Sequence, residues 1–512
     1  METIDLAVKQ AAQAFTTYKK ISPRQRAAFL RAIAEEINTL GDELINTASA
    51  ESNLPLPRLQ GERDRTTGQL RLFADLITEG SWVNARIDKG TPDIRQMQIP
   101  LGVIGIFGAS NFPLAFSVAG GDTAAALAAG STVVFKAHPA HPQTSDLVAN
   151  AILTAAKNTG LPEGVFSLIH GATIDTGQQL ALHPQLSAIA FTGSFRGGKA
   201  LYDTATRRVV PIPVYAEMGS VNPVFFLPRV LKEKGEALAA QFLQSLTMGV
   251  GQFCTNPGVF LTLNGTDKSV PFNGPSSSYE GMENKQASVS SNETNASPSS
   301  NRSGTDLFLP TLQKGIAAMP TGRMLTPGIL EAYNSGINSL RQAGAQLLGK
   351  APATAHQASP ALLQISATQA LEDPALCHEV FGPSSLHISA NSKEELFQLA
   401  NALEGQLTAT IHGTEEDLHE YAELVDILRE KAGRIVINGF PTGVAVNHAM
   451  VHGGPWPATT PAAGTSVGSS AIYRFCRPVC YQDFPAYLLP PELQDENPLG
   501  IWRLFNGNFS KT

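Results

Sequence analysis

Apolar and polar positions divide the chain into an all-helical N-terminal stretch and a longer region in which strand-like and helical segments alternate. Over residues 1–80 the apolar side chains repeat at helical spacing, as Leu30, Ile33, Ile37 and Leu40 do. Ser22 followed by Pro23 predicts the start of one of these helices. A serine side chain caps free backbone N–H groups, and proline suits the first helical position.

From residue 101 onward, short apolar runs are separated by segments of helical periodicity. The predicted strands are 103–107, 132–136, 165–169, 188–191 and 212–216. The predicted helices span 113–129, 142–158, 173–182 and 197–207. Apolar strands that alternate with helices indicate a doubly wound parallel sheet covered on both faces. Such a sheet binds ligands beyond the carboxyl ends of its strands, so the turns after these runs are where chemistry is expected.

The rest of the chain divides by pattern into three kinds of segment. Residues 221–455 continue the α/β alternation, whereas 82–100 and the tail after 471 alternate apolar and polar residues in short strand-like runs. Residues 264–304 are rich in Ser, Asn, Pro and Gly, and we expect them to be a disordered surface insertion.

Composition narrows the class of protein. With 43% hydrophobic and 16% charged residues, the chain is globular in type, and its net charge of −7 argues against nucleic acid as the main partner. No long uncharged apolar run is present, which predicts no membrane span. The start, METIDLAVKQAAQAF, is an amphipathic helix pattern rather than a signal peptide. Four cysteines do not form a disulfide framework, so a cytoplasmic location is expected.

Four short motifs carry the candidate chemistry. They lie at 108–113 (GASNFP), 217–223 (EMGSVNP), 251–255 (GQFCT) and 379–383 (EVFGP). Each is a weak signal alone. In this order and at these separations they closely resemble the aldehyde dehydrogenase superfamily, and the resemblance covers nearly the whole chain apart from 264–304.

The resemblance implies an α/β fold with three parts. Residues 1–81 and 101–219 would form a Rossmann-type, doubly wound NAD(P)-binding domain, and residues 220–455 an α/β catalytic domain. Residues 82–100 and 471–512 would form a small bridging β element that pairs strands across subunits, giving a homodimer or homotetramer.

The chemistry explains the residue types. An aldehyde gives up hydride only after a nucleophile has made its carbonyl carbon tetrahedral, and a thiolate does this well. By resemblance Cys254 is the nucleophile, and the side-chain amide of Asn111 with the Cys254 N–H binds the oxyanion. Glu217 is the base that activates water to hydrolyse the thioester. A base that works near neutral pH needs apolar surroundings, so we expect the pKa of Glu217 to be raised.

Outside this context the same residues have plainer explanations. Cys254 alone would be a small core side chain, Glu217 a capping or surface carboxylate, and Asn111 a turn residue. Cys476 and Cys480 form a C-x₃-C pair with no second pair, so we predict no metal site.

The cofactor prediction rests on resemblance rather than on a glycine fingerprint, because no G-x-G-x-x-G is present. Residues 193–200 (GSFRGGKA) nearly match a phosphate loop, but Ala200 replaces the hydroxyl that would hold magnesium. Gly193 and Ser194 instead resemble the family's turn at the pyrophosphate. Lys136 resembles the lysine at the adenosine ribose, and Glu379, followed by Phe381, the residue at the nicotinamide ribose.

The residues expected near the adenosine ribose favour the use of NADP as well as NAD. The position where NAD-selective proteins commonly place an acid is Pro139, and Lys136, His138 and Arg196 are expected close by. The alternative for His138 and its neighbour His141 is two solvent-facing loop histidines.

The C-terminal half narrows the substrate. Residues 440–444 (FPTGV) and 450–460 (MVHGGPWPATT) resemble the branch that contains 2,5-dioxovalerate (α-ketoglutarate semialdehyde) dehydrogenases. A related fatty-aldehyde branch shares the His-Pro pairs near Lys136. Phe116, Phe253 and Phe440 are expected to line the aldehyde tunnel, with core packing as the alternative. No residue is identified for the far carboxylate of a semialdehyde.

Three rival functions stay open. The chain could be a medium- or long-chain fatty aldehyde dehydrogenase, a CoA-acylating relative, or a non-catalytic assembly protein of the same fold. Retention of Glu217 favours hydrolysis over transfer to CoA. Ser220 replaces a glycine that is usual after Met218-Gly219, a change expected to be tolerated.

Overall fold

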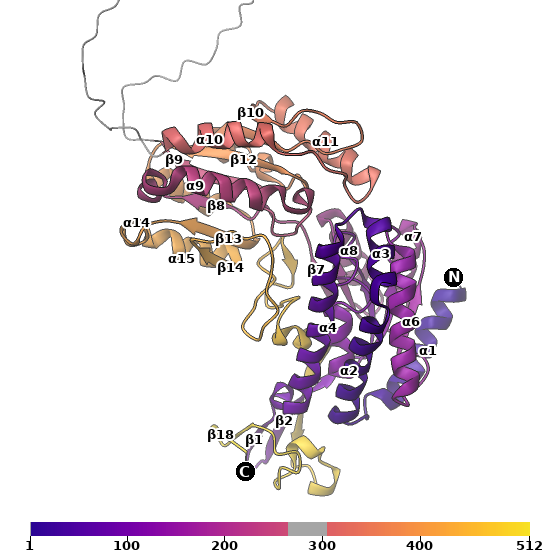
Figure 1. Cartoon of the computed structure of the whole chain (residues 1–512). Helices are drawn as coiled ribbons and strands as arrows, with labels where there is room; N and C mark the ends of the chain where they lie inside the picture. The colour runs from indigo at the N-terminus through magenta and orange to yellow at the C-terminus, as the bar shows by residue number, and fades with distance from the viewer. Residues whose placement is uncertain (1, 265–304, 512) are drawn as a thin grey trace, which may run out of the picture.

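The structure, a computed structural model, describes residues 2–264 and 305–511 (Figure 1). The insertion predicted at 264–304 lies outside these residues except for Asn264. The described chain forms a six-stranded, a seven-stranded and a five-stranded sheet. Among the described helices, none is long and apolar enough to cross a membrane.

The N-terminal stretch is helical, as predicted. Its helices are α1 (Glu2–Tyr18), α2 (Pro23–Thr39), α3 (Gly41–Ser52) and α4 (Leu56–Glu79). Ser22 caps α2, because its side chain accepts the backbone N–H of Gln25 at 3.2 Å. Helix α1 is amphipathic, with Ile4, Val8 and Ala11 buried against the six-stranded sheet.

The predicted doubly wound sheet is confirmed. Its strand order is β15-β7-β6-β3-β4-β5, and β3 to β7 are parallel. The strands are β3 (Val103–Phe107), β4 (Thr132–Lys136), β5 (Phe166–Ile169), β6 (Leu186–Thr192), β7 (Val214–Glu217) and the antiparallel β15 (Thr459–Thr460). The helices between them are α5 (Gly121–Ala129), α6 (Pro142–Asn158), α7 (Ile174–Leu182) and α8 (Phe195–Thr206).

Both faces of this sheet are covered, because alternate strand residues enter different cores. Val103 and Val134 pack with α1, α7 and α8, whereas Ile104 and Val133 pack with α2, α4, α5 and α6. This explains the continuous apolar runs that predicted the strands.

One helix prediction was too long at its start. The helix predicted over 113–129 begins only at Gly121, and residues 109–120 form a loop. The buried carboxylate of Glu62 accepts the backbone N–H groups of Leu114 and Ala115 at 2.8 and 3.0 Å. These amides are therefore held by α4 rather than by a further helical turn.

The seven-stranded sheet has the order β10-β11-β12-β9-β8-β13-β14, parallel except for β10. Its strands are β8 (Val224–Phe226), β9 (Val259–Leu263), β10 (Gln346–Lys350), β11 (Ala361–Ser366), β12 (Ser384–Ala390), β13 (Gln406–His412) and β14 (Ala432–Ile437). Helices α9 (Pro228–Thr247) and α10 (Thr305–Ala318) cover one face. The other elements are α11 (Pro327–Gln342), α12 (Ala367–Glu372), α13 (Lys393–Ala402), α14 (Glu415–Glu420) and α15 (Ala422–Lys431).

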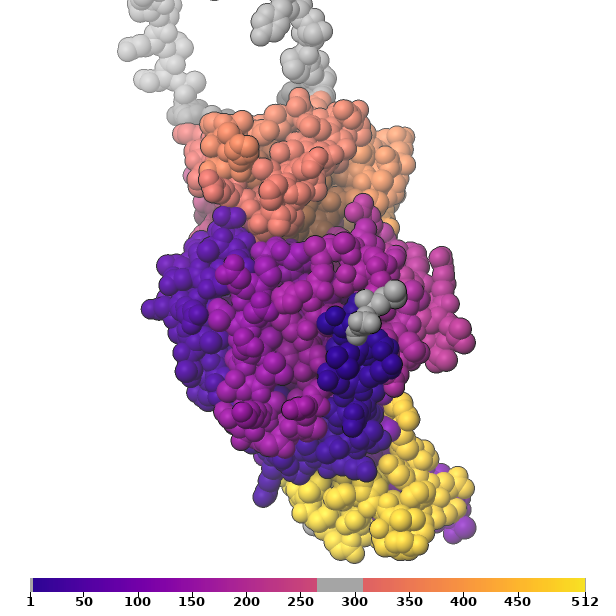
Figure 2. Space-filling view, turned by 90° about the vertical axis from the view of Figure 1, so that its right-hand side faces the viewer, coloured from indigo at the N-terminus to yellow at the C-terminus, as the bar shows by residue number. Residues whose placement is uncertain are grey.

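The strand-like segments 82–100 and 471–512 meet in the five-stranded sheet. Its order is β16-β2-β1-β17-β18, with β1 (Arg86–Asp88), β2 (Ile94–Pro100), β16 (Cys476–Gln482), β17 (Arg503–Phe505) and β18 (Asn508–Ser510). Figure 2 shows the C-terminal segment, in yellow, projecting below the N-terminal helices. Between β14 and this sheet, the chain runs past the junction of the two larger sheets (Figure 1).

Candidate active site

The carboxyl ends of the six-stranded sheet collect several predicted site residues. Glu217 is the last residue of β7, Lys136 is the last residue of β4, and Asn111 follows β3. Ser194 follows β6 and caps α8 by accepting the N–H of Gly197 at 3.2 Å. Because the strands are parallel, their polar ends lie along one edge.

Loops that lead into strands of the seven-stranded sheet lie opposite this edge. Cys254 precedes β9, and the buried Asn222 precedes β8. The Asn222 side-chain amide donates to the carbonyl oxygens of Cys254 and Asn256, both at 2.9 Å. Gly251 has φ of 65°, and a Cβ there would collide with the backbone of Gly382. Glycine is therefore required for the nucleophile loop to approach the segment before β12.

Cys254, Glu217 and His452 form a buried reacting cluster. Cys254 Sγ lies 3.3 Å from His452 Nε2, and the same nitrogen lies 2.9 Å from Glu217 Oε1. Both the His452 and Glu217 side chains are almost completely buried, and Ser466 Oγ donates to Glu217 Oε2. His452 Nε2 can therefore exchange a proton with the thiol on one side and the carboxylate on the other.

Sequence reasoning assigned no role to His452. The residue lies 198 positions after Cys254 and stands in the stretch at 450–460 that suggested the substrate branch. The histidine in this Val-His-Gly-Gly run could have been singled out from the sequence, because histidine is a common general acid or base. Its place beside the thiol depends on the return of the chain to the junction, which no local pattern predicts. There His452 N donates to Thr465 Oγ1 at 2.8 Å, and His452 O accepts the N–H of Ser466 at 2.8 Å.

The expected raised pKa of Glu217 was wrong in sign. Burial alone raises the pKa, but the charge and hydrogen bond of His452, the hydroxyl of Ser466 and the charge of Arg474 outweigh it. The pKa of Glu217 therefore lies below its ordinary value, and the carboxylate is ionised. The surroundings are not simply apolar, because an imidazole and a guanidinium reach the carboxylate.

The Cys254 thiol titrates in the opposite direction. Burial first, and then the negative charges of Glu217 and Glu379, raise its pKa well above the ordinary value, while Arg65 lowers it. At neutral pH the thiol keeps its proton, so its activation needs an acceptor. His452 Nε2, which lies 3.3 Å from Sγ, is that acceptor in the neutral tautomer whose proton is on Nδ1.

Asn111, the predicted oxyanion donor, is held by two hydrogen bonds. Its buried side-chain amide donates to the carbonyl oxygen of Gln252 at 3.0 Å, and its own carbonyl accepts Arg58 Nη2 at 2.7 Å. The second N–H of this amide has no partner among the described residues. Within the described ranges, the backbone N–H of Cys254 also donates to no other group. One N–H of the Asn111 amide and the Cys254 N–H are thus left free by the fold.

Two of the three predicted aromatic residues line the site. Phe116 and Phe253 belong to one buried cluster with Phe112, whose ring centroid is 5.3 Å from that of Phe116 and 5.4 Å from that of Phe253. The Phe116 ring lies 6.0 Å from the His452 ring. The partly buried Val444, Val446 and Met450, which sequence reasoning did not single out, pack on the same cluster.

The structure does not bring Phe440 to this cluster. Its ring packs against His412 at 4.6 Å and against Phe242 at 6.2 Å, in the core formed by α9 and the seven-stranded sheet. The segment turns after Asn438, which has φ of 53°, and Val444 rather than Phe440 packs on the cluster of Phe112, Phe116 and Phe253.

The predicted cofactor residues on the adenosine side fall into an open and a buried group. Gly193, Ser194 and Arg196 are exposed at the start of α8, and Lys136 is half-buried. The Lys136 ammonium makes no hydrogen bond or ion pair to a described residue, and burial lowers its pKa. An unpaired lysine beside an exposed helix start fits an anionic ligand such as a dinucleotide phosphate.

His138 and His141 are not the solvent-facing loop histidines of the alternative. His141 is buried, and its Nε2 lies 3.1 Å from the carbonyl oxygen of Ala109, so it ties α6 to the loop after β3. Burial, followed by the charges of His141 and Lys136, lowers the pKa of His138 to about 3. His138 is therefore neutral at physiological pH, and positive charge on this side comes from Lys136 and Arg196.

Glu379 approaches the turn after β7. A Cβ on Gly219 would collide with Glu379 Oε2, so a larger residue there would displace this carboxylate. Glu379 is exposed as a residue, yet desolvation of its carboxylate raises the pKa to about 7. Phe381 is half-buried two residues later.

Ser220 makes side-chain hydrogen bonds that a glycine at this position could not make. Its hydroxyl lies 2.9 Å from Gln406 Oε1 and accepts the backbone N–H of Leu407 at 3.0 Å. Gln406 Oε1 also accepts the N–H groups of Val221 and Asn222. The hydroxyl that replaces glycine thus ties the turn after Glu217 to β13.

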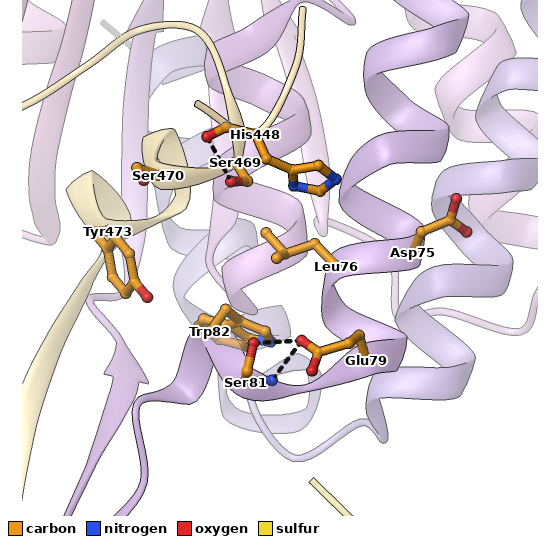
Figure 3. A pocket seen from close by; sticks show the side chains of 9 residues that line it. All are labelled: Asp75, Leu76, Glu79, Ser81, Trp82, His448, Ser469, Ser470 and Tyr473. Atoms are coloured by element: carbon orange, nitrogen blue, oxygen red, sulfur yellow. Dashed lines mark hydrogen bonds between the residues drawn. The ribbon is translucent and has the colours of Figure 1, made fainter. Parts of the chain in front are cut away.

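A separate surface hollow of about 480 Å³ lies away from the nucleophile (Figure 3). Asp75, Leu76 and Glu79 line it from α4, and Trp82 closes its lower side. His448 and η4 (Ser469–Phe475) face them, and Ser469 Oγ donates to the His448 carbonyl oxygen at 3.3 Å. None of the reacting groups lines this hollow.

Among the described residues, one group of ligand-type side chains comes within 4.8 Å, namely Glu217, Cys254 and His452. These are the reacting groups themselves, and a thiol between an acid and an imidazole suits proton transfer. Cys476 is buried with its Sγ toward the carbonyl of Ile472, whereas Cys480 is exposed, so the two do not face a common point.

Comparison with known proteins agrees with this geometry. The family model described as the aldehyde dehydrogenase family matches residues 1–269. The chain is 47% identical to an alpha-ketoglutaric semialdehyde dehydrogenase 2 of Azospirillum brasilense, over 98% of this chain and 91% of the relative. It is 45% identical to an alpha-ketoglutaric semialdehyde dehydrogenase of Acinetobacter baylyi, over 99% of this chain and 91% of that one.

Solved structures show the same fold. Betaine aldehyde dehydrogenase of Staphylococcus aureus, in complex with NAD+, has a TM-score of 0.74 at 19% identity and covers 94% of this chain and 88% of its own. Glyceraldehyde-3-phosphate dehydrogenase of Methanocaldococcus jannaschii, complexed with NADP, has a TM-score of 0.75 at 20% identity and covers 94% of each chain. Together with the near full-length relatives, these matches establish that the chain belongs to the aldehyde dehydrogenase family.

Proposed function

We propose that this enzyme oxidises 2,5-dioxovalerate, which is α-ketoglutaric semialdehyde, to 2-oxoglutarate with NAD or NADP. The observation that supports this reaction most directly is the cluster of Cys254, His452 and Glu217 at the junction of the two large sheets. For the substrate, support comes from the two relatives at 45% and 47% identity that bear the semialdehyde name.

The first step is addition of Cys254 Sγ to the aldehyde carbon. The thiol proton moves to His452 Nε2, and the adjacent Glu217 carboxylate stabilises the imidazolium that forms. The product is a thiohemiacetal on Cys254. Its oxyanion accepts hydrogen bonds from the second Asn111 amide N–H and from the Cys254 backbone N–H.

The residues present fit a nicotinamide dinucleotide. Lys136 and the start of α8 would hold its phosphate and adenosine side, and Glu379 would hold the nicotinamide ribose. When bound, this cofactor supplies the oxidant, because it takes the hydride that leaves the tetrahedral carbon. The exposed Arg196 and the absence of an acid at Pro139 support use of NADP as well as NAD.

Hydrolysis of the resulting Cys254 thioester needs a proton acceptor for water. Glu217 is ionised and lies within 4.8 Å of both Cys254 and His452. It takes the proton of the attacking water, and the thiol leaves to regain a proton from His452. This use of water as acyl acceptor distinguishes the proposal from a CoA-acylating reaction.

A fatty aldehyde dehydrogenase is the second candidate. The cluster of Phe112, Phe116 and Phe253 beside the thiol favours it, because three rings could receive an alkyl chain. A non-catalytic assembly role would leave the buried cluster at Cys254 without a purpose.

Initial rates of reduced cofactor formation separate these functions. We expect kcat/KM for 2,5-dioxovalerate to exceed that for hexanal at least about tenfold, with either NAD or NADP. A preference for hexanal would move the protein to the fatty-aldehyde function. No turnover of any aldehyde would contradict an enzymatic role, and acyl-CoA formed on addition of CoA would contradict hydrolysis.

We also propose that the five-stranded sheet joins subunits into a homodimer or homotetramer. Tyr487, Trp502 and Phe509 are exposed on this projecting element, and β16 and β18 are its open edges. Light scattering of the intact chain, compared with a Tyr487→Asp variant, measures the assembly. A monomeric wild type would contradict it.

A further inference from the structure

Helix α4 presents one polar face to the reacting cluster. Arg58, Glu62 and Arg65 recur at a spacing of four and three residues, which places them on one side of the helix. The Arg58 guanidinium lies 4.5 Å above the Phe253 ring, and that of Arg65 lies 4.9 Å from the Phe116 ring. Both arginines thus border the aromatic cluster, and both lie close enough to Cys254 for its charge to act on their pKa values.

The Arg65 guanidinium has donors that the fold does not use. Its Nε and Nη2 are buried, and neither has a hydrogen-bond partner among the described residues. These two N–H groups lie on the same side of a guanidinium and form the fork that binds a carboxylate through both oxygens. Buried unpaired donors are uncommon in native proteins and call for a ligand.

Positive charge at this face exceeds the negative charge that α4 supplies. Glu62 is the carboxylate between the two arginines, and its Oε1 is already engaged by the N–H groups of Leu114 and Ala115. Burial raises the pKa of Glu62, which weakens its ability to neutralise its neighbours. On α4 itself, two guanidinium charges therefore stand beside one carboxylate.

Other cations near the thiol are less suitable. Arg58 Nη2 already donates to the Asn111 carbonyl oxygen at 2.7 Å. Arg434 donates from both terminal nitrogens, to the carbonyl oxygens of Gly443 at 3.0 Å and Pro441 at 2.6 Å. Among the buried guanidinium nitrogens of the described residues, Arg65 alone has both Nε and Nη2 without a partner.

We infer that Arg65 binds the far carboxylate of the aldehyde substrate and so determines specificity for an anionic semialdehyde over an alkyl aldehyde. This inference rests on the proposed function. The rings of Phe112 and Phe116 hold the guanidinium and exclude water, which strengthens its hydrogen bonds to a carboxylate. An alkyl chain in the same place would leave the buried fork unpaired, and this lowers its affinity.

The test compares two five-carbon aldehydes, 2,5-dioxovalerate and pentanal, in Arg65→Met and Arg65→Lys. We expect the ratio of kcat/KM for dioxovalerate over pentanal to fall roughly tenfold to hundredfold in Arg65→Met. Most of the change should be in KM for dioxovalerate. Arg65→Lys keeps the charge but not the fork, so its ratio should lie between those of wild type and Arg65→Met.

The matched control is Arg71→Met on the same helix. Arg71 is half exposed and pairs with Glu35 at 2.7 Å, away from the thiol. Its removal takes the same charge from α4, and the substrate ratio should stay within about twofold of wild type.

The outcomes separate the two proposals. A wild type that does not prefer dioxovalerate overturns the proposed function and the anchor together. A wild type that prefers it, with an unchanged ratio in Arg65→Met, overturns the anchor alone. An equal loss for both aldehydes would mean that Arg65 acts on the Cys254 thiol, and this also overturns the anchor. If Arg65→Met does not fold, an unchanged ratio in Arg65→Lys overturns it.

Discussion

The reacting cluster and the α4 face lie side by side, yet they differ in how their polar groups are satisfied. In the cluster, Cys254 Sγ, His452 Nε2 and Glu217 Oε1 contact one another, and His452 Nδ1 is left without a hydrogen-bond partner among the described residues. On the α4 face, the Arg65 fork has no partner among the described residues. Groups that exchange protons with each other perform the same chemistry on any aldehyde, whereas a donor without a partner responds to what the substrate carries.

This difference predicts two kinds of variant. Changes in the cluster should reduce turnover of 2,5-dioxovalerate and pentanal alike. Changes on the α4 face should alter the ratio between them.

Replacement of the nucleophile should abolish activity on both aldehydes. In Cys254→Ala no thiohemiacetal can form, so kcat should fall by at least about 10⁴-fold for either substrate. Steady-state rates and a cofactor-binding titration measure the two effects separately. Substantial residual turnover of either aldehyde would show that another group adds to the carbonyl.

Removal of the imidazole should shift the pH dependence. The charge and hydrogen bond of His452 lower the pKa of Glu217, so in His452→Gln burial prevails and that pKa rises. In wild type, activity that needs the carboxylate is lost only as pH falls below the ordinary carboxyl range. In the variant, the loss should begin at higher pH, with kcat/KM also reduced roughly tenfold to hundredfold.

The check is a profile of kcat/KM against pH for both aldehydes. The acid limb should move upward by the same amount with dioxovalerate and with pentanal. An acid limb that stays in place would mean that His452 does not control the Glu217 carboxylate.

Arg58 should behave as part of the cluster although it lies on α4. It donates to the Asn111 carbonyl oxygen and covers the Phe253 ring, so Arg58→Met should loosen the oxyanion donor. We expect kcat/KM to fall about tenfold for both aldehydes, with little change in their ratio. A selective loss for dioxovalerate would instead assign the carboxylate to Arg58.

The smallest effect is expected at the hollow near the other end of α4. Asp75 and Glu79 lie there on the solvent side, and Asp75 already pairs with Arg31 at 2.6 Å. The Asp75→Asn and Glu79→Gln double variant should raise kcat/KM for dioxovalerate by less than about twofold, because exposed charges are screened. A large rise would indicate that the anionic substrate passes through this hollow.

Regular elements were predictable where local chemistry decides the conformation. The strands at 103–107 and 132–136 begin and end as predicted, because each is a continuous apolar run buried on both faces. Helix α2 begins at Pro23 because Ser22 caps it. Residues 113–120 were predicted as helix but form part of a loop, because the amides of Leu114 and Ala115 are held by Glu62, which lies about fifty residues earlier.

The candidate site was predictable where motif and strand end coincide, and less so elsewhere. Asn111 and Glu217 follow or end predicted strands, so sequence could place them. His452 contacts the thiol, and Val444 packs on the neighbouring aromatic cluster, through the long return of the chain. Arg65 meets that cluster from one face of α4. None of these placements produces a local motif. The predicted direction of the Glu217 pKa shift was wrong for the same reason. The groups that lower this pKa, His452, Ser466 and Arg474, are distant in sequence.

The central claim is that Cys254 carries the acyl group and that Glu217 releases it. The most direct test is to mix Glu217→Gln with 2,5-dioxovalerate and NADP, quench the reaction and map the peptides by mass spectrometry. The account predicts a burst of NADPH of about one per active site, with an oxoglutaryl group on Cys254 alone, because the thioester forms but is not hydrolysed. Continued turnover without a trapped acyl group, or an acyl group on another residue, would contradict it.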